Sequence, residues 1–208
     1  MSKEIALKVD KVLNEFGRSP LHGTRLANPP TLDARPEIVL AMVIDALIKA
    51  RPISHELTQK TIKTLIEADY HDIDVLSNST WDDRTMVLED GGYNRYREQC
   101  ATNLDGDLNN LLKQANGKPE KVKLLLKEVK GIGDLAAEVF LNNVQSVWPS
   151  IAPFIDSRSL KAADEIGIGT NLNQIYKILD QDPVRMSWFA NGLSEVRLEK
   201  RQDVIEEV

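Results

Sequence analysis

The sequence has one cysteine, few aromatic residues and no long apolar run. Cys100 is the only cysteine among 208 residues, which excludes an intramolecular disulfide, an all-cysteine zinc site and a cysteine-ligated iron–sulfur cluster. This cysteine usage favours a reducing compartment, so we expect an intracellular protein, in the cytoplasm, nucleoid or nucleus. The longest apolar run, residues 38–44, is far too short to cross a membrane, and the polar N-terminus lacks the apolar core of a signal peptide.

Negative charge is in excess over the whole chain, but not everywhere. The formal net charge is −6, which argues mildly against nucleic acid as a partner. Residues 118–130 have an excess of positive charge, with five lysines and two glutamates. Such a local basic helix can form a phosphate-binding face in an acidic chain. A solvated amphipathic face is the alternative.

Apolar residues recur with the helical period of 3.6, and no stretch alternates as a strand does. The chain is therefore predicted to be all-α, with about ten helices. Three tryptophans are expected in the core, namely Trp81, Trp148 and Trp188, and the acidic end at 203–208 is expected to fray. The expected helices span residues 2–17, 36–50, 54–68, 72–76, 80–90, 94–114, 120–129, 134–147, 157–166, 171–180 and 183–201.

The most informative stretch is a Gly131-Ile132-Gly133 turn between two apolar-patterned helices, preceded by lysines that include Lys127 and Lys130. Two glycines permit positive φ and close approach of another backbone, and Ile132 is expected to point inward as an anchor. Free N–H groups beyond such a turn suit phosphate. The carbonyls of the turn could bind a monovalent cation; no other cofactor is expected. An ordinary αα-hairpin is the alternative.

A second Gly-Ile-Gly sequence, at 167–169, has no lysine-bearing helix before it and is predicted to be a helix stop followed by a new cap. Asp156 ends a proline-containing loop and opens a helix. An aspartate there can be a plain N-cap or a carboxylate at the edge of a cleft, and the two roles are compatible. The three histidines lack metal-ligand spacing, so no metal site is expected.

The order of these parts is that of a known family. A glycine hairpin, an apolar helix, Trp148-Pro149-Ser150-Ile151, a loop and an aspartate opening a helix together resemble the helix-hairpin-helix DNA glycosylase superfamily (HhH-GPD) of endonuclease III type. Residues 91–97 and Asn116-Gly117 resemble the segment before the hairpin in that family. The resemblance covers about residues 36–166 and is specific over 118–163.

The resemblance implies two helical subdomains flanking a central cleft. One is a helical barrel over 36–147, with the hairpin at about 120–147, and the other combines 1–35 with 148–208. It also implies binding to double-stranded DNA with a nucleotide rotated out of the stack. Asp156 would stabilise the developing oxocarbenium charge or position a water. The oligomeric state stays open, with a monomer favoured and no membrane partner.

Two departures from the family narrow the expected chemistry. Leu135 stands where bifunctional members carry the Schiff-base lysine, so no lyase activity is expected through it. The single cysteine leaves no iron–sulfur cluster. If the chain is an enzyme, it is predicted to be a monofunctional N-glycosylase, a hydrolase of base excision repair. A non-catalytic DNA-binding relative and a protein-interaction scaffold are the alternatives.

Further DNA contacts are expected from cationic and aromatic side chains. Arg51 is a candidate wedge residue, against the alternative of a helix-end arginine. Tyr93 and Arg95 suit stacking and phosphate contact, against core packing and solvation. The complete set of expected DNA contacts is Lys127, Lys130, Gly131, Ile132, Gly133, Arg51, Tyr93, Arg95 and Arg158.

Overall fold

The computed structural model describes residues 3–27, 32–94, 114–115 and 117–206. Within these ranges all regular structure is helical: 11 α-helices, one π-helical turn and one 3₁₀ turn. The prediction of an all-α fold is therefore confirmed. The helix expected over 94–114 lies almost wholly outside the described residues. None of the helices within them is both long and apolar enough for a membrane crossing.

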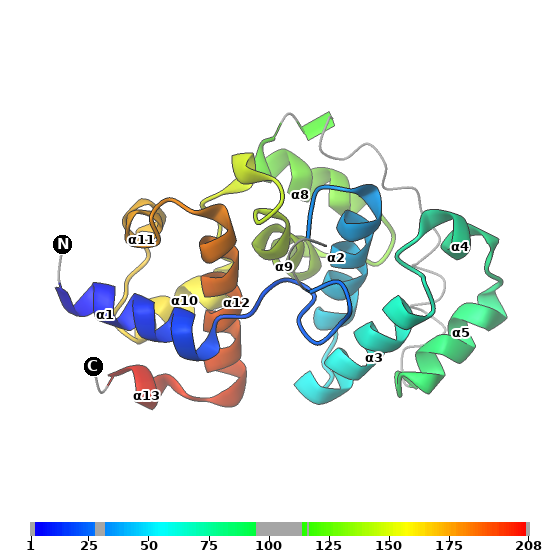
Figure 1. Ribbon diagram of the computed structural model, residues 1–208, viewed down its shortest axis with the longest axis horizontal. Coiled ribbons are helices and arrows are strands. Elements are labelled where there is room, and N and C mark those ends of the chain that lie inside the picture. Colours follow the sequence, from blue (N-terminus) through cyan, green and yellow to red (C-terminus); the bar gives the residue numbers. More distant parts are fainter. Residues whose placement is uncertain (1–2, 28–31, 95–113, 116, 207–208) are drawn as a thin grey trace. The chain divides into compact units, whose positions relative to one another are not determined.

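The chain divides into two compact units (Figure 1). Unit 1 comprises residues 1–20 and 141–208, and unit 2 comprises residues 21–140. The subdomains drawn from the sequence end elsewhere, at 36 and 147. The loop after Pro20 belongs to unit 2, where Leu21 is buried and Arg25 donates a hydrogen bond to the carbonyl of Ile66.

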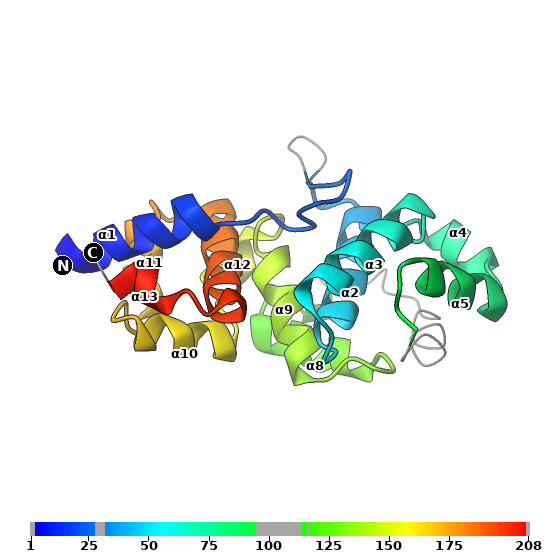
Figure 2. The same ribbon diagram turned by 90° about the horizontal axis from the view of Figure 1, so that it is seen from below.

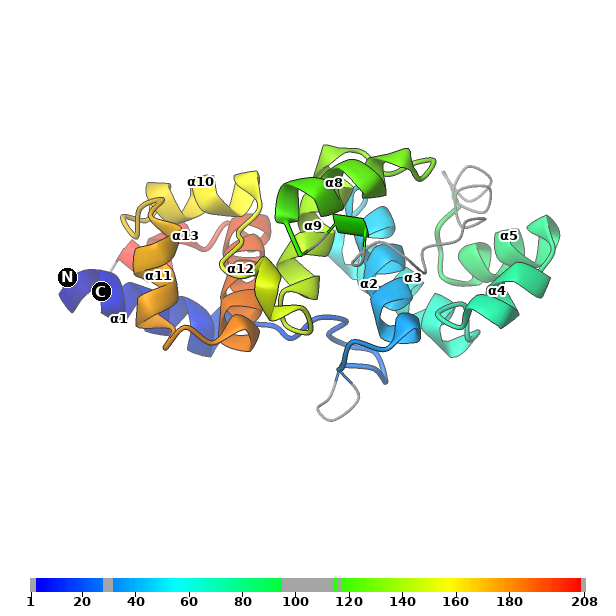
Figure 3. The ribbon, with the colours of Figure 1, turned by 90° about the horizontal axis from the view of Figure 1, so that it is seen from above.

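Unit 2 is built around one apolar helix. Pro36 opens α2 (Pro36–Lys49) at a position where a missing N–H costs nothing, and all residues from 38 to 48 are buried. α3 (His55–Glu67) packs against both α2 and α5 (Trp81–Asp90). α4 (Ile73–Asn78) and α5 lie side by side beyond it (Figures 1 and 3). Ser54, Asp72 and Thr80 cap α3, α4 and α5. Unit 2 also contains α8 (Pro119–Glu128) and the first part of α9 (Asp134–Val144).

Unit 1 is organised by α12 (Pro183–Glu199), which packs against α10 (Ser157–Glu165) and the π-helical turn Val12–Phe16. A Cβ on Gly192 would lie 3.1 Å from the backbone nitrogen of Gly17, so only a glycine permits this close approach. Figure 2 shows the remaining helices around α12. They are α1 (Lys3–Lys11), α11 (Leu172–Ile178) and α13 (Gln202–Glu206).

Two expectations about burial are wrong. The acidic end was expected to fray, but Gln202–Glu206 forms α13, where Ile205 is fully buried and Lys11 donates to the carbonyl of Val204. Trp81 was expected in the core, but it is the first residue of α5 and 42 % exposed. The packing of α13 depends on a partner distant in sequence, which local pattern does not report.

The second Gly-Ile-Gly sequence is a helix stop, as predicted. Gly167 and Gly169 have φ of 77° and 85°, and the N–H groups of Ile168 and Gly169 both donate to the carbonyl of Ala163 inside α10. Asn171 then caps α11 by accepting from the N–H of Gln174.

Candidate functional site

The first Gly-Ile-Gly sequence forms an exposed turn between α8 and α9, which lie side by side in all three ribbon views. Gly131 has φ of 91°, in the region that favours glycine. The N–H of Ile132 donates to the carbonyl of Val129 over 3.1 Å and closes the turn. Gly131 and Gly133 are exposed, whereas Ile132 is only 7 % exposed. The turn therefore presents glycine backbone to solvent and fixes itself through a buried isoleucine.

The turn leads directly into the N-terminus of an eleven-residue helix. The N–H of Ala137 donates to the carbonyl of Gly133, so the helical hydrogen bonds of α9 begin at Gly133. The N–H groups of a first helical turn have no acceptor within the helix and lie at its positive end. A Cβ at Gly133 would meet no atom within 4 Å. The backbone here is open to an approaching anion.

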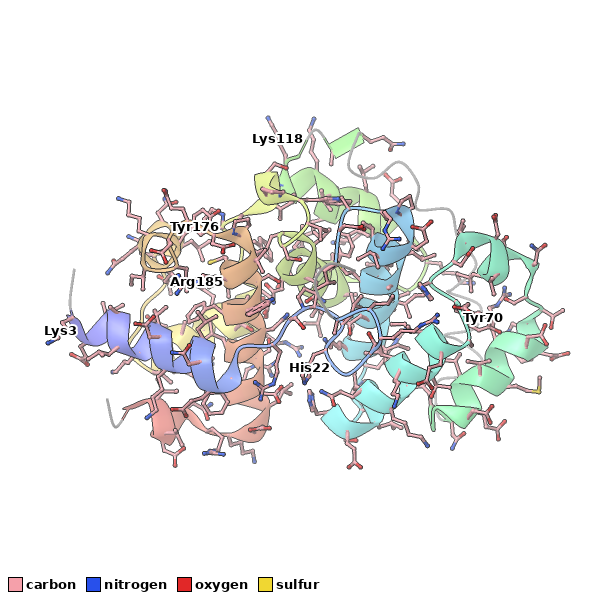
Figure 4. The ribbon with its side chains drawn as sticks, viewed as in Figure 1. Lys3, His22, Tyr70, Lys118, Tyr176 and Arg185 are labelled. Atoms are coloured by element: carbon pink, nitrogen blue, oxygen red, sulfur yellow. The ribbon has the colours of Figure 1, made fainter. Side chains whose placement is uncertain are left out.

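Five lysines lie along residues 118–130, and Lys127 and Lys130 are the ones next to the turn. Lys118 projects outward from the start of α8 (Figure 4), and Lys121, Lys127 and Lys130 are also exposed. Lys123 differs, because its Nζ lies 2.7 Å from Oε1 of Glu138. That hydrogen bond raises the pKa of Lys123. Four of the five lysines are therefore exposed, and the fifth is bound to Glu138.

An acidic side chain lies within the same surface. Oδ1 of Asp134, the first residue of α9, is 3.0 Å from Nζ of Lys127 and 3.4 Å from Nζ of Lys123. The hydrogen bond from Lys127 is the foremost cause that lowers the pKa of Asp134. Lys127, one of the expected DNA contacts, is thus already paired, and a phosphate at the helix N-terminus would compete with this carboxylate.

Asp156 is buried and serves as a helix cap. The residue is 2 % exposed, and its Oδ1 accepts from the N–H groups of Arg158 and Ser159, each over 3.0 Å. Its Oδ2 accepts from Nδ2 of Asn142 over 2.6 Å, and Oδ1 of Asn142 accepts from the N–H of Asp156 over 2.8 Å. The N-cap role, one of the two alternatives, is confirmed.

Sequence reasoning missed the polar side chains at the end of α9 that position this loop. Gln145 is fully buried; its amide nitrogen donates to the carbonyl of Phe154 over 2.9 Å and its amide oxygen accepts from the N–H of Phe154 over 3.0 Å. Asn142 binds Asp156 in the same two-sided way. The available signal was the Asn142-Asn143 pair on an otherwise apolar helix, since buried amides require partners.

Four expected contacts remain, and three of them lie within the described residues. Arg51 is half-buried just after α2, and its backbone N–H donates a hydrogen bond to the carbonyl of Ile48. Tyr93 is 1 % exposed, so its ring packs inside unit 2 and does not present a stacking face. Arg158 is exposed. Arg95 lies outside the described residues.

The structure thus brings the expected contacts together in two groups. Lys127, Lys130 and the turn at 131–133 belong to one hairpin of unit 2, and Asp156 with Arg158 belongs to one loop and helix start of unit 1. Leu135 is half-buried in the first turn of α9 and carries no nucleophile.

Among the described residues, no three His, Cys, Asp or Glu side chains lie close enough to form a metal-binding group. Comparisons of the chain with protein-family models, with curated proteins and with solved structures give no match.

Proposed function

We propose that this chain is an intracellular protein of base-excision-repair type that binds double-stranded DNA through the α8–α9 hairpin. The observation that supports the proposal is the exposed turn at 131–133, with its positive φ at Gly131 and its buried anchor Ile132. Backbone N–H groups at the start of α9 would bind a phosphate oxygen. The exposed lysines of α8 would contact neighbouring phosphates as point charges.

Charge limits where DNA would bind. The whole chain has a net charge of −6, so nonspecific attraction over its entire surface would be weak and the lysine-bearing hairpin would dominate. Contacts of this kind release counterions, and each phosphate neutralised contributes about −0.9 to the slope of log K against log salt concentration. Binding would therefore be steeply salt-dependent and tolerant of sequence.

Duplex binding by the full chain tests the proposal. Fluorescence anisotropy with a labelled duplex is expected to show a Lys130→Ala variant binding about 3-fold to 10-fold more weakly, with a salt slope smaller by about 1. Lys177→Ala is the matched control, because Lys177 is an exposed lysine of α11 in unit 1, distant along the chain from both the hairpin and Asp156. Equal losses in both variants, or no duplex binding by the wild type, would reject the proposal.

In the enzyme candidate, catalysis would rest on Asp156, in the loop before α10. Its carboxylate would stabilise positive charge on the sugar as the bond to a damaged or mispaired base breaks, and water would complete the hydrolysis. Leu135 offers no amine to form a Schiff base. The expected product is an abasic site in an uncut strand, which defines a monofunctional N-glycosylase.

A second candidate is a DNA-binding relative without catalysis. The contacts of Asp156 favour it. The carboxylate is 2 % exposed and accepts three hydrogen bonds, two from backbone N–H groups and one from Asn142. A carboxylate in this position stabilises α10 whether or not it meets a sugar.

Base release from a panel of damaged and mismatched duplexes distinguishes the two candidates. A simple Asp156→Asn variant would oppose its new amide donor to Nδ2 of Asn142 and lose stability for that reason alone. The double variant Asn142→Asp with Asp156→Asn avoids this, because the side-chain hydrogen bond is kept with donor and acceptor exchanged and the backbone N–H of residue 156 still donates to residue 142. It moves the carboxylate from α10 to α9.

The enzyme candidate requires base release by the wild type that is lost in a folded, DNA-binding double variant. Release unaffected by the exchange would remove Asp156 from the mechanism. Duplex binding without base release across the panel would establish the non-catalytic candidate.

A further inference from the structure

A groove in unit 2, far along the sequence from the hairpin, lies between α4 and α5. It encloses about 650 Å³. Tyr70, at the end of α3 in Figure 4, lines it together with Val75, Met86 and Val87, and the carboxylate residues Asp74 and Asp83 belong to the same lining. All of these residues come from one continuous stretch of unit 2, so the groove is a property of that unit alone.

Two apolar side chains that line the groove are exposed to solvent. Val75 is 41 % exposed and Met86 is 58 % exposed. A methionine at such a surface adapts its shape to different apolar partners. Val75 and Met86 line the same groove, so one apolar partner surface could cover both side chains.

The same stretch concentrates the negative charge of the protein. Residues 69–90 include seven acidic residues and one arginine, a net charge of −6, which equals the net charge of the whole chain. The arginine, Arg84, is buried and donates to the carbonyl of Ser79. Hydrogen bonds from Thr80 lower the pKa of Asp83, so that carboxylate is ionised at neutral pH. The potential around the groove is therefore negative.

We propose that this groove is the docking site for a basic amphipathic helix of a partner protein. The apolar face of that helix would pack on Val75 and Met86, and its lysine or arginine side chains would meet Asp74 and the exposed Asp82. The negative rim excludes nucleic acid and acidic segments by repulsion. Helix-in-groove binding reads apolar anchors at i, i+3, i+4 and i+7, which suits a short groove between two helices.

A second copy of this chain is the competing occupant. Its α8 is basic and exposes Leu124 at 65 %. Such a contact would join two different surfaces, and a contact of that kind grows into rings or open chains rather than a closed dimer. A helix of another protein offers the same basic and apolar groups without forming rings or open chains, so we assign the groove to such a partner.

The probe is a labelled leucine–lysine peptide of about 14 residues with leucines at helical spacing, and the control peptide has the same composition in scrambled order. Anisotropy titration with the full chain at physiological salt is expected to show the patterned peptide binding about 10-fold tighter than the scrambled one. Equal affinity for the two peptides would reduce the interaction to bulk charge and overturn the proposal.

Matched variants locate the site. Met86→Gln is expected to weaken patterned-peptide binding about 10-fold and Asp74→Asn about 3-fold. The controls are Leu198→Gln and Asp164→Asn, which remove an exposed leucine and an exposed carboxylate from unit 1 and should leave binding unchanged. Equal effects in variants and controls would overturn the assignment. Sedimentation showing self-association that Met86→Gln abolishes would instead give the groove to a second copy and refute the partner.

Discussion

Two segments within residues 118–163 differ in exposure. They are the hairpin turn at 131–133 and the loop that ends at Asp156. The hairpin turns its glycine backbone outward and buries one isoleucine. The loop turns its aspartate inward, where an asparagine and two backbone N–H groups surround the carboxylate. The hairpin is available to a ligand as it stands, whereas Asp156 is already fully engaged within unit 1.

The contrast in exposure shows that residue type alone does not distinguish a binding group from a structural one. Glycine and lysine at a helix start keep their binding capacity because the fold leaves them exposed. An aspartate at a helix start satisfies orphan N–H groups first. For Asp156, the cap is an observed role, and any catalytic role has to coexist with it.

The largest expected effect is on stability at Asp156. Replacing it with alanine leaves the amide of Asn142 and the N–H groups of Arg158 and Ser159 without their acceptor, so we expect a loss of about 3 kcal/mol. Chemical denaturation followed by circular dichroism measures it. The double variant that exchanges Asn142 and Asp156 should lie within about 1 kcal/mol of the wild type. A loss below about 1 kcal/mol for Asp156→Ala would break the contrast between the two regions.

The next effect concerns backbone conformation in the hairpin. Gly131 has φ of 91°, which an alanine adopts at a cost of about 1–2 kcal/mol. Gly133 is the matched control, because a Cβ there meets open space and its φ is not among the positive ones. Denaturation should separate Gly131→Ala from a nearly neutral Gly133→Ala. Similar losses in both would mean that the turn is constrained by something other than its φ.

Most helices of this fold could be predicted from sequence because their ends are local. Pro36, Ser54 and Thr80 each announce a helix start, and the structure places α2, α3 and α5 directly after them. The wrong expectations concern Trp81 and the C-terminal residues. The order of the C-terminal residues is decided by contacts such as that of Lys11 with Val204, 193 positions away.

The candidate site was predictable to the same extent. The hairpin rests on adjacent residues, so its turn, its buried Ile132 and its exposed Lys130 follow from local pattern. The state of Asp156 does not, because its partner Asn142 comes from another helix 14 positions earlier. Local sequence offered a cap and a cleft-edge carboxylate as compatible roles. The N–H groups of Arg158 and Ser159 confirm the cap, and the burial against Asn142 is what local sequence could not show.

A smaller effect sharpens the claim that the hairpin binds phosphate. Asp134 pairs with Lys127 and Lys123 at the start of α9, so Asp134→Asn removes a negative charge and frees Lys127, while Lys123 keeps its hydrogen bond to Glu138. We expect duplex affinity to rise about 3-fold at low salt, and less at high salt. Anisotropy titration at two salt concentrations measures it. Asp164→Asn, an exposed carboxylate of unit 1, is the control. Unchanged affinity in Asp134→Asn would place DNA contact away from this hairpin.

The smallest effect is the pH dependence of the same ion pair. Lys127, and then Lys123, lower the pKa of Asp134 below its ordinary value of 3.8. The unfolded chain then binds the proton more readily than the folded chain. The stabilisation is therefore fully present above pH 3.8 and is lost as pH falls through the lowered folded value. The difference in unfolding free energy between wild type and Asp134→Asn should be constant from pH 7 to about 5 and should shrink toward zero at lower pH. A difference that persists in acid would show that Asp134 stabilises α9 through hydrogen bonding alone, and would leave Lys127 as free as Lys130 to meet DNA.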